Sequence, residues 1–222
     1  MSRTAKNSKA VEFDAELEKA LKSLKKADKQ LARVIKNVGP CTLKPNDIQS
    51  PFLALAESII YQQLSGKAAA TIFGRVEALY ADSGGMTAKS VLKTPVEILR
   101  GAGCSNAKAV ALIDLAEKTV SGVVPTESQL HKMPDQEIID RLVSIRGVGK
   151  WTVEMLLIFR LGRMDVMPAT DYGIRKGFGL TYGLPDLPTP KKILEHSEIW
   201  KPYRTLASWY LWRCLELPES AW

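Results

Sequence analysis

The stretch DRLVSIRGVGKWTVEMLLIF, residues 140–159, predicts two helices joined by a tight glycine turn. Apolar residues recur at helical spacing on both sides of the turn, and the glycines permit backbone angles that a side chain would forbid. Backbone N–H groups at the start of the second helix, together with its dipole, favour a phosphate. Lys150 adds a positive charge at the same place. An ordinary helix–helix connection with a glycine C-cap is the alternative.

Most of the remaining chain also has the apolar spacing of helices. Residues 11–37 repeat apolar side chains at intervals of three and four, which predicts helix over this stretch. Ser50-Pro51 and Ser105 are typical capping residues at the starts of further helices. Alternating stretches of strand length are scarce. The sequence therefore predicts an all-α protein of about ten helices, with its core divided between two helical lobes.

The composition indicates a basic protein without structural metal or disulfides. The chain has 31 lysines and arginines against 24 aspartates and glutamates, a net charge of +7. This balance favours a polyanionic partner, although an ordinary basic enzyme has the same composition. Cys41, Cys104 and Cys214 lie far apart, and no CxxC or HExxH pattern is present. Because no signal peptide or membrane-spanning run is evident, we expect an intracellular protein.

Four motifs occur in a fixed order along the chain. They are YQQLSGKAA (61–69), the glycine turn, DVMPATDYGIR (165–175) and KPYRTLASWYLWR (201–213). Together they resemble the helix–hairpin–helix Gly/Pro-Asp DNA glycosylase superfamily, and within it the 3-methyladenine DNA glycosylase II branch, the alkylpurine glycosylases. The resemblance covers roughly residues 15–217. It implies an all-α, two-lobed glycosylase fold with an active-site cleft between the lobes.

The resemblance also sets the expected domain boundaries. Residues 1–12 would form a flexible N-terminus, and residues 13–222 would form the glycosylase domain. One lobe would span about 51–160, and the N-terminal and C-terminal helices would form the other.

Asp171 is the expected catalytic residue. Breaking an N-glycosidic bond builds positive charge on the sugar, and a nearby carboxylate stabilises that charge and orients or deprotonates the incoming water. A base alkylated at N3 or N7 is already cationic, so one carboxylate suffices. Asp171 would equally serve as a helix cap, and the two roles are compatible. Many members of the family carry an acidic residue at the position of Thr170, so the chain departs from the pattern there.

Trp151 argues against strand cleavage. In the family, members that also cut the strand carry a nucleophilic lysine at this position, and an indole cannot form a Schiff base. Lys150 lies one residue earlier, about 100° away around the helix, so we expect it to point away from the pocket. The resemblance places several residues in the base pocket, and core packing is the alternative for the tryptophans. They are Trp151, Met155, Trp212, Trp209 and Tyr61.

Two contacts with DNA are implied by the same resemblance. A minor-groove wedge is expected at Gln63, Leu64 and Ser65, where Leu64 would fill the gap left by a flipped base and Gln63 would bond the orphaned partner base. A core leucine is the alternative for Leu64. The hairpin would bind the DNA backbone and hold an alkali-metal ion on carbonyls near Ile145 and Val148, without side-chain ligands. The hairpin residues expected at the backbone are Gly147, Val148, Gly149, Lys150 and Thr152.

Four other charged or titratable residues are expected to be structural. Asp165 is interpreted as a loop or ion-pair residue, and Arg204 as the partner of a loop carboxylate or as a phosphate ligand. His131 and His196 lack neighbouring metal ligands and are expected at the surface or with satisfied hydrogen bonds.

The sequence as a whole predicts a monofunctional DNA glycosylase that initiates base excision repair. It would hydrolyse the N-glycosidic bond of alkylated purines, such as 3-methyladenine and 7-methylguanine, in duplex DNA by base flipping and aspartate-assisted water attack. We expect a monomer without a cofactor, located with the DNA in a nucleoid or nucleus. The alternatives are a binding protein for abasic or damaged DNA, a glycosylase–lyase for oxidised bases, and a helical adaptor, for which no dedicated surface motif is present.

Overall fold

The computed structural model describes residues 3–45 and 50–218. In this part of the chain all regular structure is helical and no β-strand is present, so the all-α prediction is confirmed. Over the same residues, none of the helices combines the length and apolarity that crossing a bilayer requires. The chain divides into a terminal unit, Met1–Lys44 with Gly162–Trp222, and a central unit, Pro45–Leu161. The expected boundaries of the glycosylase domain and of its two lobes stay a prediction.

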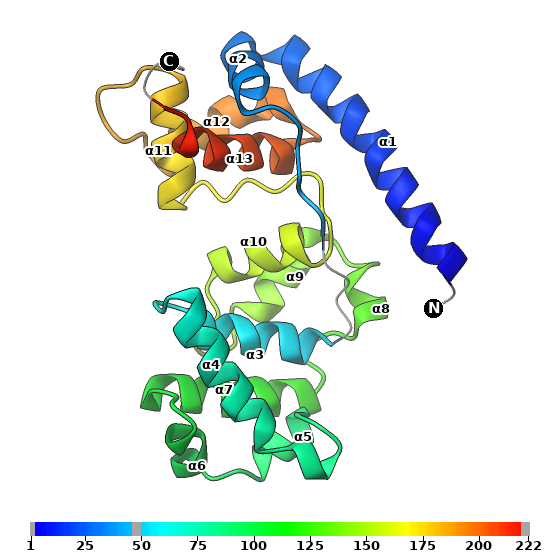
Figure 1. The fold of residues 1–222 in the computed structure, drawn as a ribbon, viewed down its shortest axis with the longest axis vertical. Helices are drawn as coiled ribbons and strands as arrows, with labels where there is room; N and C mark the ends of the chain where they lie inside the picture. Colours follow the sequence, from blue (N-terminus) through cyan, green and yellow to red (C-terminus); the bar gives the residue numbers. More distant parts are fainter. Residues whose placement is uncertain (1–2, 46–49, 219–222) are drawn as a thin grey trace. The chain divides into compact units, whose positions relative to one another are not determined.

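The terminal unit packs α-helices from the two ends of the chain against each other (Figure 1). Its helices are α1 (Arg3–Ala27), α2 (Lys29–Val38), α11 (Tyr172–Thr181), α12 (Pro190–Ser197) and α13 (Arg204–Arg213), with 3₁₀ turns at Glu198–Trp200 and Cys214–Glu216. Leu31, Phe178 and Tyr210 are buried in its core. Helix α1 begins at Arg3, within the segment assigned to a flexible terminus, and that assignment stays a prediction.

Asp28 interrupts the helical pattern of residues 11–37 and separates α1 from α2. Its Oδ1 accepts hydrogen bonds from the backbone N–H groups of Gln30 and Leu31, at 2.9 and 3.0 Å. Asp28 has an extended backbone, with φ −144° and ψ 111°, as an N-cap requires. The apolar spacing continues across this break, so periodicity alone did not reveal it.

The buried Asp28 side chain also links the N-terminal helices to the C-terminal ones. Its Oδ2 accepts hydrogen bonds from the Tyr182 hydroxyl and, at 3.0 Å, from the Trp200 indole, and His196 Nε2 lies 3.0 Å away. Burial alone would raise the pKa of Asp28, but these bonds and that from Leu31 N–H outweigh it and lower the pKa. His196 is therefore a partnered structural histidine, as expected.

The central unit is built around one long helix, α7. Its helices are α3 (Pro51–Tyr61), α4 (Gly66–Ala78), α5 (Ala88–Leu92), α6 (Val96–Gly101), α7 (Asn106–Val120), α8 (Glu127–Leu130), α9 (Asp135–Leu142) and α10 (Lys150–Phe159), with a 3₁₀ turn at Ala81–Ser83. Helix α7 lies against α3, α5 and α6 and buries Leu112 and Leu115. Ser50 and Ser105 cap α3 and α7, as their positions predict.

Candidate functional site

Asp171 stands at the N-terminus of α11 in the terminal unit. Its Oδ1 accepts hydrogen bonds from the backbone N–H of Ile174 and from the indole N–H of Trp212, both at 2.8 Å. The first bond makes Asp171 the helix cap, one of the two roles left open by the sequence. The second comes from a predicted base-pocket residue. Together they fix the orientation of a half-buried carboxylate, which follows the exposed Thr170.

The loop that leads to Asp171 is fastened to the start of α13. Arg204 pairs with Asp165 through two hydrogen bonds of 2.7 and 2.9 Å, so the expected ion pair is confirmed. The hydroxyl of Thr205 accepts a hydrogen bond from the Val166 N–H at 3.0 Å. Because a bidentate arginine–carboxylate pair is geometrically specific, it restrains the loop in one path toward Asp171.

Two glycines let α11 and α13 approach closely. A Cβ on Gly173 would lie 2.9 Å from Cδ1 of Trp212 and 3.1 Å from Oδ1 of Asp171. A Cβ on Gly177 would lie 2.0 Å from the carbonyl oxygen of Leu211. The bond between Trp212 and Asp171 therefore depends on glycines that sequence reasoning missed. Their i, i+4 spacing, which puts both on one face of a helix, is the signal that could have found them.

The predicted base-pocket tryptophans of the terminal unit differ in burial. Trp212 is half-buried beside Asp171, whereas Trp209 is buried and has the Arg213 guanidinium 5.9 Å from its ring centroid. Helix packing accounts for Trp209, and its place in the base pocket stays a prediction. Tyr172, which no motif singled out, directly follows Asp171 and is 66% exposed, so it is an additional aromatic candidate.

The predicted hairpin lies where residues 143–149 join α9 to α10 in the central unit. Gly147 has a φ of +77°, and a Cβ there would lie 3.3 Å from the Ala111 Cβ, so this position needs glycine. Gly149 opens α10 without a side-chain cap. The N–H groups of the first turn of α10 are consequently a suitable site for an anion.

The other predicted hairpin residues differ in what they can contribute. Ile145 and Val148 are buried, and the Val148 N–H donates to the Ile145 carbonyl at 3.0 Å. Thr152 is buried, and its contact with the DNA backbone stays a prediction. Lys150 is exposed, with Nζ 3.6 Å from Oε1 of the buried Glu154. The alkali-metal ion near Ile145 and Val148 stays a prediction.

Two side chains of α7 hold the hairpin backbone. Asp114 Oδ2 accepts a hydrogen bond from the Arg146 N–H at 2.7 Å, and Lys118 Nζ lies 2.9 Å from the same oxygen. Lys118 also donates to the Ser144 carbonyl at 2.5 Å. Burial alone would raise the pKa of Asp114, but the bonds from Arg146 and Lys118 outweigh it and lower the pKa. An ionised pair on α7 thus restrains the hairpin from two sides.

Trp151 and Met155 lie one turn apart on α10, on one face of the helix. Trp151 is 44% exposed and Met155 is half-buried, so core packing does not explain Trp151. Tyr61 ends α3, where it is half-buried and makes an edge contact with Phe73 at 6.5 Å between ring centroids. All three residues belong to the central unit, and their role in the base pocket stays a prediction.

The predicted wedge forms the turn between α3 and α4. Gln63 has a φ of +58°, which is uncommon for a residue other than glycine. Leu64 is 38% exposed, so it is not the core leucine of the alternative interpretation. Ser65 caps α4 by accepting a hydrogen bond from the Ala68 N–H at 3.4 Å. The turn therefore presents an apolar side chain at the surface.

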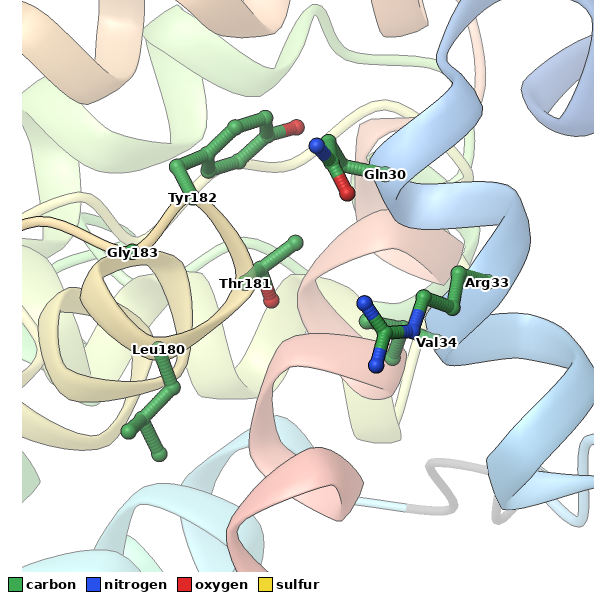
Figure 2. Close-up of a pocket in the computed structure, with 7 residues that line it drawn as sticks. All are labelled: Gln30, Arg33, Val34, Leu180, Thr181, Tyr182 and Gly183. Atoms are coloured by element: carbon green, nitrogen blue, oxygen red, sulfur yellow. The ribbon is translucent and has the colours of Figure 1, made fainter. Parts of the chain in front are cut away.

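A cavity of about 290 Å³ lies elsewhere in the terminal unit, between α2 and the end of α11. Figure 2 shows Gln30 and Arg33 extending from α2 toward this end of α11. The lining residues are Gln30, Arg33, Val34, Leu180, Thr181, Tyr182 and Gly183. Asp171 caps the opposite end of α11, about 15 Å away along a ten-residue helix, so this cavity is separate from the predicted catalytic residue.

Comparison with known proteins gives consistent matches. A family model described as "HhH-GPD superfamily base excision DNA repair protein" matches residues 56–202. DNA-3-methyladenine glycosylase 1 of Schizosaccharomyces pombe is 39% identical over 211 residues, covering 94% of this chain and 92% of that protein. The alkylbase DNA glycosidase-like protein mag2 of the same yeast is 34% identical over 205 residues, covering 92% and 96%. The solved structure of an S. pombe 3-methyladenine DNA glycosylase in complex with abasic DNA has a TM-score of 0.78 and 40% identity, covering 90% of this chain and 97% of that chain.

Proposed function

The chain belongs to the HhH-GPD superfamily of base excision DNA repair proteins, and we propose that it is a monofunctional DNA glycosylase for alkylated purines. It hydrolyses the N-glycosidic bond of bases such as 3-methyladenine and 7-methylguanine in duplex DNA and leaves the sugar–phosphate chain intact. Relatives named for 3-methyladenine match it over at least 90% of its length. The enzyme acts as a monomer on the genome, in a nucleoid or nucleus.

The observation that carries this proposal is the Asp171 carboxylate, held by the Ile174 N–H and the Trp212 indole. As the glycosidic bond breaks, its electron pair leaves with the purine and positive charge builds on the sugar. A carboxylate of fixed orientation stabilises that charge and accepts a proton from the attacking water. An alkylated purine is already cationic, so it leaves without protonation by an acid.

Aromatic side chains supply selectivity for a cationic base. Aromatic faces attract cations, and flipped bases stack on aromatic rings. Trp212 lies against the catalytic carboxylate, and Trp151 with Met155 offers apolar surface on α10. Trp209 and Tyr61 complete the proposed pocket.

The residues at the start of α10 favour base release without strand cleavage. Trp151 occupies the position at which a lyase of this family carries its nucleophilic lysine, and an indole cannot attack C1′ of the sugar. Lys150 precedes that position by one residue, and its exposed ammonium lies 3.6 Å from Oε1 of Glu154 on the next turn of the helix. Borohydride should therefore trap no covalent complex between this protein and DNA.

DNA is bound by the hairpin and by the wedge of the central unit. The first-turn N–H groups of α10 and Lys150 contact phosphate. Leu64 enters the minor groove and fills the space of the flipped base, and Gln63 bonds the orphaned partner base. Ser65 completes the wedge.

Release of free base from methylated duplex DNA tests the proposal. We expect Asp171→Asn to lower the single-turnover rate about 100-fold or more, because the charge that stabilises the sugar is lost. Asparagine is a good N-cap, so α11 should stay folded. Asp186→Asn is the matched control, because Asp186 is exposed in the loop after α11 of the same unit. Tight binding to abasic DNA with no base released by the unmodified protein would instead support a binding protein.

A further inference from the structure

The wedge turn, defined as residues 62–65, has a conformation that needs restraint by neighbouring groups. Gln63 is the one non-glycine residue with positive φ in the described part of the chain. Leu64 projects at the surface, and its N–H reaches the Tyr61 carbonyl at 3.3 Å, a long hydrogen bond. A left-handed residue beside an exposed leucine is unfavourable unless neighbouring groups hold it.

Lys108 of α7 supplies the first restraint. Its Nζ donates to the carbonyl oxygens of Ile60 and Gln62, both at 2.8 Å. These carbonyls lie at the C-terminal end of α3, where helical carbonyls lack partners in their own helix and the dipole is negative. Desolvation by burial lowers the pKa of Lys108, as expected of an amine drawn away from solvent. The ammonium thus fixes the point at which α3 passes into the turn.

The Gln62 side chain supplies the second restraint. Its Nε2 donates to the Gly147 carbonyl at 2.8 Å and lies 3.5 Å from Oγ1 of Thr152. Gly147 belongs to the hairpin, 85 residues further along the chain. One amide therefore connects the wedge turn directly to the hairpin within the central unit.

We propose that Lys108 and Gln62 are positioning residues that fix the wedge turn to the hairpin (below, the lock). Leu64, the plug that fills the gap left by the flipped base, and the phosphate-binding hairpin then engage DNA as one rigid element. This inference rests on the proposed function. Preorganisation of this kind raises the fraction of bound DNA in which the plug is inserted. Lys108 itself makes no contact with phosphate, because its ammonium is directed to backbone carbonyls of the protein.

The test uses the full-length protein and a duplex with 2-aminopurine beside a stable abasic analogue. Insertion of the plug unstacks the 2-aminopurine and raises its fluorescence. We expect Lys108→Met and Gln62→Met each to lower the increase at saturating protein about threefold or more, as Leu64→Ala should. The loss of fluorescence increase in the double variant should be no larger than the sum of the losses in the two single variants, because both residues restrain one turn. Lys89→Met, a charge-matched change at an exposed lysine of α5, should leave the signal unchanged.

The salt dependence of DNA affinity separates positioning from phosphate binding. The slope of log Kd against log salt should be unchanged in Lys108→Met and Gln62→Met, whereas Lys150→Met should reduce its magnitude by about 1. A reduction of about 1 in Lys108→Met would mean that its ammonium reaches DNA, and an undiminished fluorescence signal would mean that the turn needs no lock; either result overturns the proposal. If Lys108→Met fails to fold, Gln62→Met, which removes one neutral side-chain donor, decides alone.

Failure of this inference differs visibly from failure of the proposed function. An unmodified protein that unstacks 2-aminopurine but releases no base would refute the glycosylase and keep the lock. An active glycosylase whose Lys108→Met and Gln62→Met variants insert the plug normally would refute the lock and keep the glycosylase.

Discussion

Gly173 occupies a position where one added methyl group would act on the catalytic carboxylate. Its Cβ would lie 2.9 Å from Cδ1 of Trp212 and 3.1 Å from Oδ1 of Asp171. Because the indole and the carboxylate must then move, we expect Gly173→Ala to lower the single-turnover rate of base release about 10- to 100-fold. DNA affinity should stay close to that of the unmodified protein, because the proposed wedge and hairpin contacts belong to the central unit.

Gly179→Ala is the matched control in the same helix. Gly179 is buried like Gly177, but a Cβ there would lie 3.6 Å from Cδ of Pro188, an ordinary contact. This variant should keep its rate of base release. Equal losses in Gly173→Ala and Gly179→Ala would point to a general sensitivity of α11, and an unchanged rate in Gly173→Ala would show that catalysis does not need the Trp212–Asp171 bond.

At the scale of helices, the contact of α11 with α13 depends on Gly177. A Cβ at this position would lie 2.0 Å from the carbonyl oxygen of Leu211, which is backbone and cannot turn aside as a side chain can. We expect Gly177→Ala to lower the free energy of unfolding by about 3 kcal/mol, the upper range for overpacked cores. Urea unfolding followed by circular dichroism measures this. A loss no larger than that of Gly179→Ala would mean that the two helices separate at little cost.

Helix starts are the part of this fold that local sequence predicts well. Ser50 and Ser105 cap their helices by hydrogen bonds to N–H groups three residues away, so all the required atoms are close in sequence. The break at Asp28 was missed because the apolar spacing runs through it. Its carboxylate is fixed by residues more than 150 positions away, and no local pattern contains that information.

In the candidate site, too, local sequence predicts some residues, whereas others depend on distant parts of the chain. Motifs single out Asp171, Trp151 and Leu64, and all three have the half-buried or exposed side chains that their proposed roles need. The residues that hold them in place, such as Gly173 and Lys108, were not found, because their roles depend on which helix faces them. A lysine directed at two backbone carbonyls has the same sequence signature as a lysine in solvent.

At the scale of the whole chain, the net charge is +7, but a buried carboxylate, that of Asp28, connects helices from the two ends of the sequence. Asp28 receives bonds from Tyr182 and Trp200, and His196 lies at the same oxygen. Removing the charge leaves the buried Trp200 and the half-buried Tyr182 and His196 without a carboxylate acceptor, which costs about 3 kcal/mol for a buried pair. We therefore expect Asp28→Asn to destabilise the protein at neutral pH, although asparagine can still cap α2.

The same group makes stability depend on acid. The pKa of Asp28 is lowered in the folded protein, whereas in the unfolded chain it is about 4. Its contribution is therefore complete above about pH 4 and is lost as the pH falls through the lower folded pKa. Urea unfolding at a series of pH values should show the free energy of unfolding falling below about pH 4, and falling less steeply in Asp28→Asn.

Asp114, whose pKa is also lowered, leaves a residual slope in that variant, and the exposed Asp186→Asn should reproduce the unmodified curve. Parallel curves for Asp28→Asn and the unmodified protein would mean that the Asp28 carboxylate gains no net stabilisation from its partners.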